Sequence, residues 1–94
     1  MIRHVSVLTF VEGADIDAIA SALSKLPTRI PALRAYSIGR DLGLADGNAN
    51  FVVVADFDDI AGYGSYLDDP EHQRILAELI RPVLASRAAV QYEC

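Results

Sequence analysis

The sequence predicts an α+β protein in which strands and helices follow one another as strand, helix, strand, strand, helix, strand. Segments 2–11 and 51–57 are rich in β-branched and aromatic residues, which is typical of strands. Segments 16–26 and 70–81 repeat apolar residues every three or four positions, which is typical of helices. At 94 residues the chain can form one modest core, so we expect a single domain over residues 1–94.

The first predicted strand, 2–11, is largely apolar on both faces, and we therefore expect it to be covered on both sides. His4 lies within one of these faces. The other residues of that face are Ile2, Ser6, Leu8 and Phe10. Asp15 can cap the helix that follows, and Pro27 is expected to end it.

The middle of the chain predicts a β-hairpin. Segment 35–40 has the character of a moderately strong strand, and the nearly continuous apolar run 51–57 predicts a strand at the centre of the sheet. The intervening segment 41–48 contains Gly43, Gly47 and Asn48 and has no apolar period, which is typical of a turn. Two strands joined in this way most simply pair with each other.

The second helical region is predicted in two pieces. Two glycines weaken the first piece, 60–67, by about 1 kcal/mol each relative to alanine. Asp69 suits the N-cap of the second piece, 70–81, and Pro70 suits its first position because the missing N–H would be unpaired there. Pro82 is expected to end or kink this helix, since its ring clashes with the preceding turn.

With a final strand over 88–93, this order is that of the ferredoxin-like βαββαβ fold, in which both helices cover one face of a four-stranded antiparallel sheet. The opposite face of the sheet has no helix to cover it. Because both faces of the first and third strands are apolar, we expect this bare face to pack on an identical sheet. The predicted assembly is a homodimer with a barrel-like centre, a dimeric α/β barrel.

The composition argues against several classes of function. The net charge is −5 and no basic stripe is present, so nucleic acid is not an expected partner. No apolar run is long enough to span a bilayer, and no export signal precedes the first strand. The single cysteine, Cys94, excludes an intrachain disulfide. We therefore expect a cytoplasmic protein without membrane contact and, in the absence of phosphate-loop, dinucleotide or metal motifs, without a cofactor.

Six short segments, taken in order, form a specific series over nearly the whole chain. They are Ile2-Arg3-His4-Val5, Pro31-Ala32-Leu33, Ser37-Ile38-Gly39-Arg40-Asp41, Val54-Ala55-Asp56-Phe57, Asp69-Pro70-Glu71-His72 and Ala89-Val90-Gln91-Tyr92-Glu93. This series resembles the stress-responsive α/β-barrel (Dabb) family, which implies a ferredoxin-like homodimer. The chain is also distantly similar to a plant member of that family, olivetolic acid cyclase, a cofactor-independent polyketide cyclase. In that cyclase a tyrosine and a histidine six residues later carry an aldol condensation, which implies Tyr66 and His72 here, with His4 as the histidine of the first strand.

His72 lies in the first turn of the predicted helix 70–81 and heads its apolar stripe, so its ring is expected to face the core. In the catalytic interpretation, His72 is a general base that takes a proton from a carbon next to a carbonyl. Tyr66 donates a hydrogen bond to the developing enolate, and His4 fixes the tautomer of His72. The helix N-terminus would keep His72 neutral. In the structural interpretation, the two histidines bond to each other or to a backbone carbonyl and fix the helix on the sheet.

Two further residues are candidates for substrate binding. Tyr63 lies three residues before Tyr66, and the two hydroxyls could line the mouth of a pocket; ordinary amphipathic packing is the alternative. Arg40 could pair with a substrate carboxylate, and a surface ion pair is the alternative.

These observations predict a dimer that binds a small, partly apolar carbonyl compound in a cleft between the sheet and the helices. One hypothesis is a cofactor-independent cyclase or lyase. A second is a non-catalytic, ligand-binding or structural dimer in which the same residues support packing. A third is a cofactor-independent monooxygenase, which belongs to another ferredoxin-like dimer family, although the order of the segments above argues against it.

Overall fold

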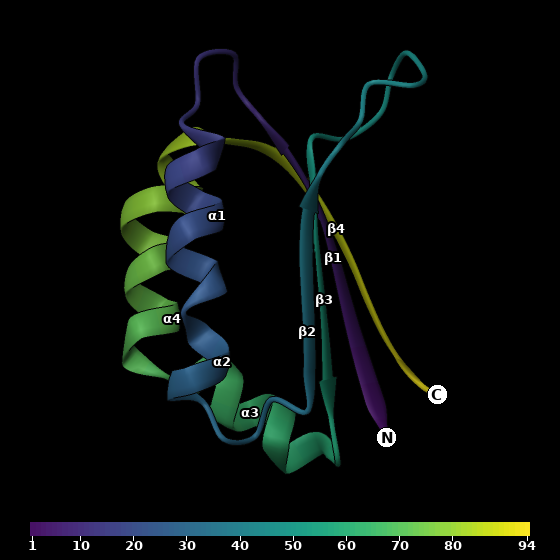
Figure 1. Cartoon of the computed structure of the whole chain (residues 1–94), viewed down its shortest axis with the longest axis vertical. Coiled ribbons are helices and arrows are strands. Elements are labelled where there is room, and N and C mark those ends of the chain that lie inside the picture. Colours follow the sequence, from purple (N-terminus) through teal and green to yellow (C-terminus); the bar gives the residue numbers. More distant parts are fainter.

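A computed structural model describes residues 1–94 as one antiparallel sheet with helices on one face (Figure 1). The strands are β1 (Ile2–Phe10), β2 (Ala35–Arg40), β3 (Phe51–Phe57) and β4 (Leu84–Glu93), in the spatial order β2-β3-β1-β4. The helices are α1 (Ile16–Ser24), α2 (Leu26–Arg29), α3 (Ile60–Asp68) and α4 (Pro70–Ile75), the last continued by η1 (Leu76–Ile80) and η2 (Arg81–Val83). This is the predicted ferredoxin-like βαββαβ order, and the prediction is confirmed.

The core lies between the sheet and the helices, where alternate residues of the two central strands are buried. On β1 these are His4, Ser6, Leu8 and Phe10, and on β3 they include Phe51, Val53, Ala55 and Phe57. The helices contribute Ile19, Leu23, Leu26, Tyr66, Ile75 and Ile80 to the same core. The face of β1 that carries His4 is therefore the face that the helices cover, and the ring of His4 packs near those of Tyr63 and Tyr66 on α3.

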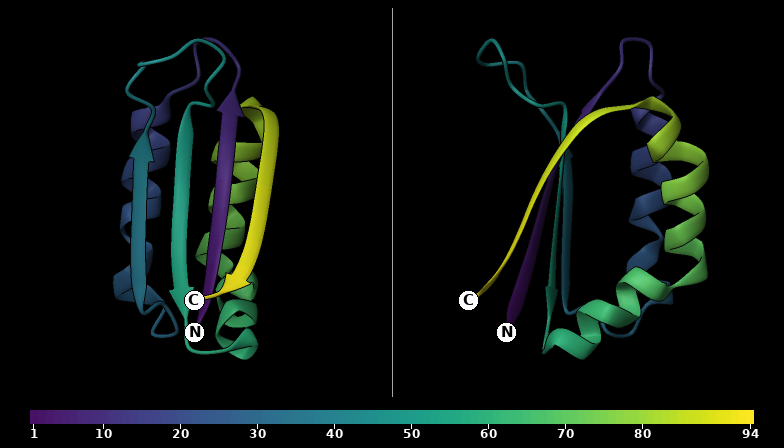
Figure 2. Two further views of the ribbon diagram at one scale, coloured as in Figure 1. Left: turned by 90° about the vertical axis from the view of Figure 1, so that its right-hand side faces the viewer. Right: turned by 180° about the vertical axis from the view of Figure 1, so that it is seen from behind.

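The other face of the sheet carries no helix, as Figure 2 shows in its left-hand view. On this face Val5 lies opposite Val54 of β3 and Val90 of β4, and Val7 lies opposite Val52 and Ala88. Val90 is 56% exposed and Tyr92 is 45% exposed. A single chain thus leaves a sheet of valines in contact with water, which the apolar character of both strand faces predicted.

The first helical region differs from its predicted bounds. We expected one helix over 16–26 with Pro27 as its end, whereas α1 stops at Ser24 and Pro27 lies in the first turn of the separate helix α2. Proline has no N–H to donate, and the first turn of a helix is the place where none is needed. Pro27 therefore starts a new helical turn and does not simply end the old one.

The last helical region also differs from its prediction. We expected one α-helix over 70–81, whereas the structure has three successive types of helical turn. The region is α-helical only to Ile75, forms a π turn over Leu76–Ile80, and ends in a 3₁₀ turn over Arg81–Val83. Pro82 lacks the N–H that the carbonyl of Glu78 would accept in a regular helix, and the widened turn lies directly before it.

No helix in the structure combines the length and the apolar character needed to cross a bilayer.

The last strand is longer than predicted, since β4 begins at Leu84 and not at residue 88. The added residues pair with the end of β1, where a bulge separates the Thr9 pairing from the Phe10 pairing. Their side chains lack β-branched character, so pairing with β1 decided their conformation where local propensity did not.

Candidate functional site

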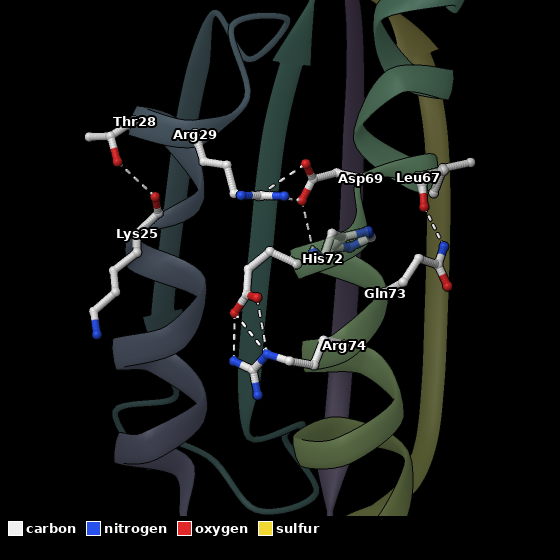
Figure 3. Close-up of polar contacts among 9 residues, drawn as sticks. Lys25, Thr28, Arg29, Leu67, Asp69, His72, Gln73 and Arg74 are labelled. Atoms are coloured by element: carbon white, nitrogen blue, oxygen red, sulfur yellow. Dashed lines mark hydrogen bonds and ion pairs between the residues drawn. The ribbon is translucent and has the colours of Figure 1, made fainter.

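The junction between α3 and α4 is fixed by the carboxylate of Asp69 (Figure 3). This carboxylate accepts a hydrogen bond of 3.0 Å from the backbone N–H of His72, which caps α4. It also accepts two bonds of 3.1 and 3.0 Å from Nε of Arg29, on the neighbouring helix α2. The side-chain amide of Gln73 donates to the carbonyl of Leu67 across the same junction. Burial alone would raise the pKa of Asp69, but the His72 N–H and the Arg29 guanidinium outweigh it and lower that pKa.

This junction turns His72 inward and places its ring against Tyr66. The two ring centroids are 4.0 Å apart with an interplanar angle of 33°, and the residues are only 5% and 3% exposed. His4 approaches from β1, with 6.2 Å between its ring centroid and that of Tyr66. The structure therefore brings together the three residues that the sequence singled out for catalysis, from one strand and two helices.

A cavity of about 330 Å³ lies beside these rings, between the sheet and the helical region that begins with α4. Its walls are mostly apolar, and the polar groups among them include those of His4, Ser6, Tyr66 and His72. The full lining is His4, Ser6, Leu8, Leu23, Val53, Tyr66, Leu67, His72, Leu76, Ile80, Arg81, Leu84 and Arg87. A mainly apolar cavity of this size with a few convergent polar groups is typical of a site for a small organic molecule.

The hydrogen bonds of the two histidines differ from the expectation. The amide nitrogen of Gln91, which lies opposite His4 on β4, is 2.9 Å from His4 Nδ1. With the amide as donor, His4 Nδ1 accepts, so the neutral ring carries its proton on Nε2. No hydrogen bond joins His4 to His72. We expected His4 to fix the tautomer of His72 through a direct hydrogen bond, and this expectation is wrong. The hydrogen-bond partner of His4 is Gln91 on the neighbouring strand.

The two ring nitrogens of His72 differ in their surroundings. Nδ1 is buried and makes no hydrogen bond of good geometry, although the backbone carbonyls of Leu67 and Tyr66 are close enough to favour the protonated ring. No group of the chain bonds to Nε2. A buried polar atom without a partner costs on the order of 1–3 kcal/mol. The structural interpretation offsets this cost through the nearby carbonyls of Leu67 and Tyr66, whereas the catalytic interpretation uses Nε2, which no group of the chain occupies.

Burial sets the protonation states of the site. It is the largest cause lowering the pKa of both His4 and His72, with Arg87 adding to the effect at His4. The backbone at Leu67 acts in the opposite direction on His72, but burial prevails. Burial likewise raises the pKa of Tyr66. At neutral pH the site therefore holds uncharged imidazoles, which can accept a proton, and a protonated phenol, which can donate a hydrogen bond.

The two residues proposed for substrate binding lie elsewhere. The ring of Tyr63 packs 5.3 Å from that of His4 but is not part of the cavity wall. Arg40 lies at the far end of β2, where its guanidinium forms a 2.7 Å ion pair with the exposed carboxylate of Asp17. The structure thus shows the surface ion pair that was the alternative use of Arg40.

Sequence reasoning missed four polar residues of this region, namely Ser6, Arg81, Arg87 and Gln91. Ser6 lies two residues after His4 on the same strand face, so strand alternation was a sufficient signal for it. To place Gln91 beside His4, one must know the register in which β4 pairs with β1. To place Arg81 and Arg87 at the cavity, one must know the path of the chain on either side of Pro82, and local sequence patterns do not predict that path.

Comparison with known proteins agrees with this architecture. A family model described as the stress responsive A/B barrel domain matches residues 2–94. A comparison with curated protein sequences gives no match.

Among solved structures, a dimeric ferredoxin-like protein of unknown function from Thermobifida fusca is 44% identical, with a TM-score of 0.90 over 99% of this chain and 90% of that one. A Dabb family protein from Mesorhizobium loti is 21% identical, with a TM-score of 0.80 over 99% and 95% of the two chains. A hydroxynitrile lyase from Passiflora edulis is 17% identical, with a TM-score of 0.82 over 97% and 90%, a likeness of fold alone. The chain belongs to the stress responsive A/B barrel (Dabb) family.

Proposed function

We propose that this protein is a cofactor-independent enzyme that removes a proton from the carbon next to a carbonyl, as cyclases and lyases of carbonyl compounds do. The observation that carries the proposal is the stacked pair Tyr66 and His72, held at the wall of a mainly apolar cavity with no hydrogen bond from the chain to Nε2 of His72. A neutral base and a protonated donor side by side are what enolate formation requires.

The proposed reaction begins with the carbonyl compound in the cavity. Nε2 of His72 takes a proton from the adjacent carbon, the C–H bond breaks, and its electron pair moves into an enolate. The Tyr66 hydroxyl donates a hydrogen bond to the enolate oxygen. The enolate carbon then attacks a second carbonyl carbon in the same molecule, and the imidazolium returns the proton to the new alkoxide. Run in reverse, the same steps cleave a carbon–carbon bond, as a lyase does.

The contributions of these groups can be sized. A positioned general base accelerates proton transfer by roughly 10²–10⁴-fold. A single hydrogen-bond donor to a developing oxyanion contributes roughly 10²–10³-fold. The hydroxynitrile lyase of the same fold indicates that this fold can support carbon–carbon bond chemistry, although its identity to this chain is only 17%.

We also propose that the working unit is a homodimer packed through the bare face of the sheet. The valines of β1, β3 and β4 form a continuous apolar surface there, and Val90 is 56% exposed in one chain. The relative from Thermobifida fusca, at 44% identity, is dimeric. Because this interface lies on the side of the sheet away from the helices, it leaves the cavity free.

The catalytic proposal can be tested without knowing the natural substrate. The two probes are 4-oxooctanoate and its methyl ester, each dissolved in D₂O, and the readout is the loss of their α-proton signals by NMR. We expect the wild-type protein to accelerate exchange of at least one probe and His72→Ala to abolish the acceleration. If the wild-type protein exchanges the α-protons of neither probe faster than His72→Ala does, the proposal is contradicted.

The folded state of the variant decides how a loss of exchange is interpreted. Circular dichroism and light scattering should show that His72→Ala keeps its fold and its dimer. If His72→Ala unfolds, His72→Gln keeps polar bulk at the same place and replaces it in the comparison. If His72→Gln is folded and accelerates exchange of the probe as much as the wild type does, the histidine is not the base.

A further inference from the structure

Two arginines of this chain have no carboxylate partner. The other five arginines form ion pairs: Arg3 with Asp56, Arg29 with Asp69, Arg34 with Asp58, Arg40 with Asp17, and Arg74 with Glu71 and Glu78. Arg81 and Arg87 form none, although the chain has thirteen acidic residues and a net charge of −5. Both line the cavity that also holds Tyr66 and His72.

Arg87 reaches the cavity from the edge strand. In the antiparallel pairing of β4 with β1, Arg87 lies directly opposite Leu8, which is buried beneath the helices. Residues directly opposite each other in such a pair project from the same face of the sheet. Arg87 therefore projects on the helix side, and the proposed dimer interface on the other face does not cover it.

Arg81 reaches the cavity because of the π turn. In a π turn the residue five positions later lies over the first one, and the N–H of Arg81 donates to the carbonyl of Leu76. Leu76 and Ile80 both line the cavity. In a regular α-helix residue 80 would take the place over Leu76, so the wider turn brings Arg81 to the cavity side.

The electrostatic character of the cavity is therefore positive. No aspartate or glutamate is among its lining residues. After the larger influence of burial, Arg87 lowers the pKa of His4 and of Tyr66, and Arg81 lowers the pKa of His72, so both charges act on the rings. Arg81 and Arg87 are both exposed residues, so their charges border the cavity on its solvent side. Cations without a carboxylate partner at such a place raise the local concentration of anions, and the planar guanidinium fork matches a carboxylate.

We infer that the substrate is a small oxo acid, whose carboxylate is held by Arg81 and Arg87 while its carbonyl lies at Tyr66 and His72. The position of the carbonyl rests on the proposed function, whereas the carboxylate site rests on the arginines alone. A volume of about 330 Å³ is at the lower end of the range of ligand sites, which favours a small acid over a nucleotide. The apolar walls formed by Leu8, Leu23, Val53 and their neighbours would cover the hydrocarbon part of the acid.

The test is a binding titration that requires no turnover. The chain has two histidines, so the imidazole signals in an NMR spectrum are few, and His4→Gln assigns them. We expect 4-oxooctanoate to shift the His72 signals with a saturating curve and its methyl ester to bind at least about tenfold more weakly, as loss of a charged hydrogen bond predicts. Equal affinity of the wild type for acid and ester would overturn the inference.

The variants locate the carboxylate site. Arg81→Gln and Arg87→Gln should each weaken binding of the acid by about tenfold or more and leave that of the ester unchanged, and Arg87→Lys should restore part of the loss. Arg34→Gln removes the same charge at an exposed ion pair and should change neither affinity. Unchanged affinity for the acid in both cavity variants would overturn the inference, as would displacement of the acid by an equal concentration of inorganic phosphate.

The two proposals can fail separately. If the acid binds through the arginines but its α-protons do not exchange faster than with His72→Ala, the catalytic role fails and the carboxylate site stands. If the ester exchanges and binds as well as the acid, the carboxylate site fails and the catalytic role stands.

Discussion

The rings of Tyr66 and His72 stack at 4.0 Å although they lie on different helices, six residues apart. In one continuous α-helix two residues at this separation would point about 120° apart around the axis. The extended backbone of Asp69, with φ −60° and ψ 128°, breaks the helix between them and turns both rings inward. The pair therefore depends on the junction and on the cap that holds it.

Replacement of Asp69 should separate the two functions of its carboxylate. Asp69→Ala removes the cap of α4 and should lower the free energy of unfolding by about 1 kcal/mol. Asp69→Asn keeps a good cap but removes the charge that faces Arg29, so we expect a smaller loss. Urea denaturation at pH 7 measures both. A loss in Asp69→Asn equal to that in Asp69→Ala would show that the ion pair with Arg29, and not the cap, fixes the junction.

Removal of one hydroxyl tests the role of Tyr66. Tyr66→Phe keeps the ring stacked on His72 but removes the proposed donor to the enolate oxygen, so α-proton exchange should slow by about a hundredfold.

Tyr63→Phe provides the matched comparison, because the ring of Tyr63 contacts His4 without lining the cavity. We expect its exchange rate to stay within about twofold of the wild type, on the order of the few tenths of a kcal/mol typical of a surface change. Equal rate losses in the two variants would contradict the assignment of Tyr66 and would support Tyr63 as a binding residue.

The two histidines should make stability depend on pH near neutrality. Burial lowers the pKa of His4 and of His72 in the folded state, so below the ordinary value of about 6.5 the unfolded chain binds more protons than the folded one. The free energy of unfolding should therefore be highest above that value and fall as the pH decreases toward the lowered pKa values.

Urea denaturation at pH 7.5 and pH 5.5 measures this fall. The double variant His4→Gln, His72→Gln serves as the control, since it removes both imidazoles while other groups titrate as before. A fall in stability of the same size in the double variant would show that other groups cause it.

A charge on the bare face of the sheet should separate the dimer. Val54 lies opposite Val5 in the middle of that face, so Val54→Lys places a cation within the proposed interface. We expect light scattering at micromolar concentration to report the mass of two chains for the wild type and of one chain for Val54→Lys. Ile60→Lys adds the same charge at a residue that is 77% exposed on the helix side and should remain dimeric. A monomeric wild type would refute the dimer.

The local pattern of the sequence decided much of this protein. The period of apolar residues determined the order of strands and helices, and strand alternation placed His4 on the same face as Ser6, Leu8 and Phe10. Both faces of this strand are apolar, so the structure decided which of them the helices cover. The pair Asp69 and Pro70 determined where α4 starts, so the inward position of His72 follows from the residues around it. These properties depend on a few neighbouring residues, and they can be deduced from one sequence for that reason.

Only the tertiary structure decided what surrounds the three rings. The contact between His4 and Gln91 joins residues 87 positions apart, and Arg87 faces the cavity because β4 pairs with β1 in one particular register. Arg81 faces it because the chain winds as a π turn before Pro82. Strand register and helix winding arise from the packing of the whole chain, since each is a small choice among locally similar conformations.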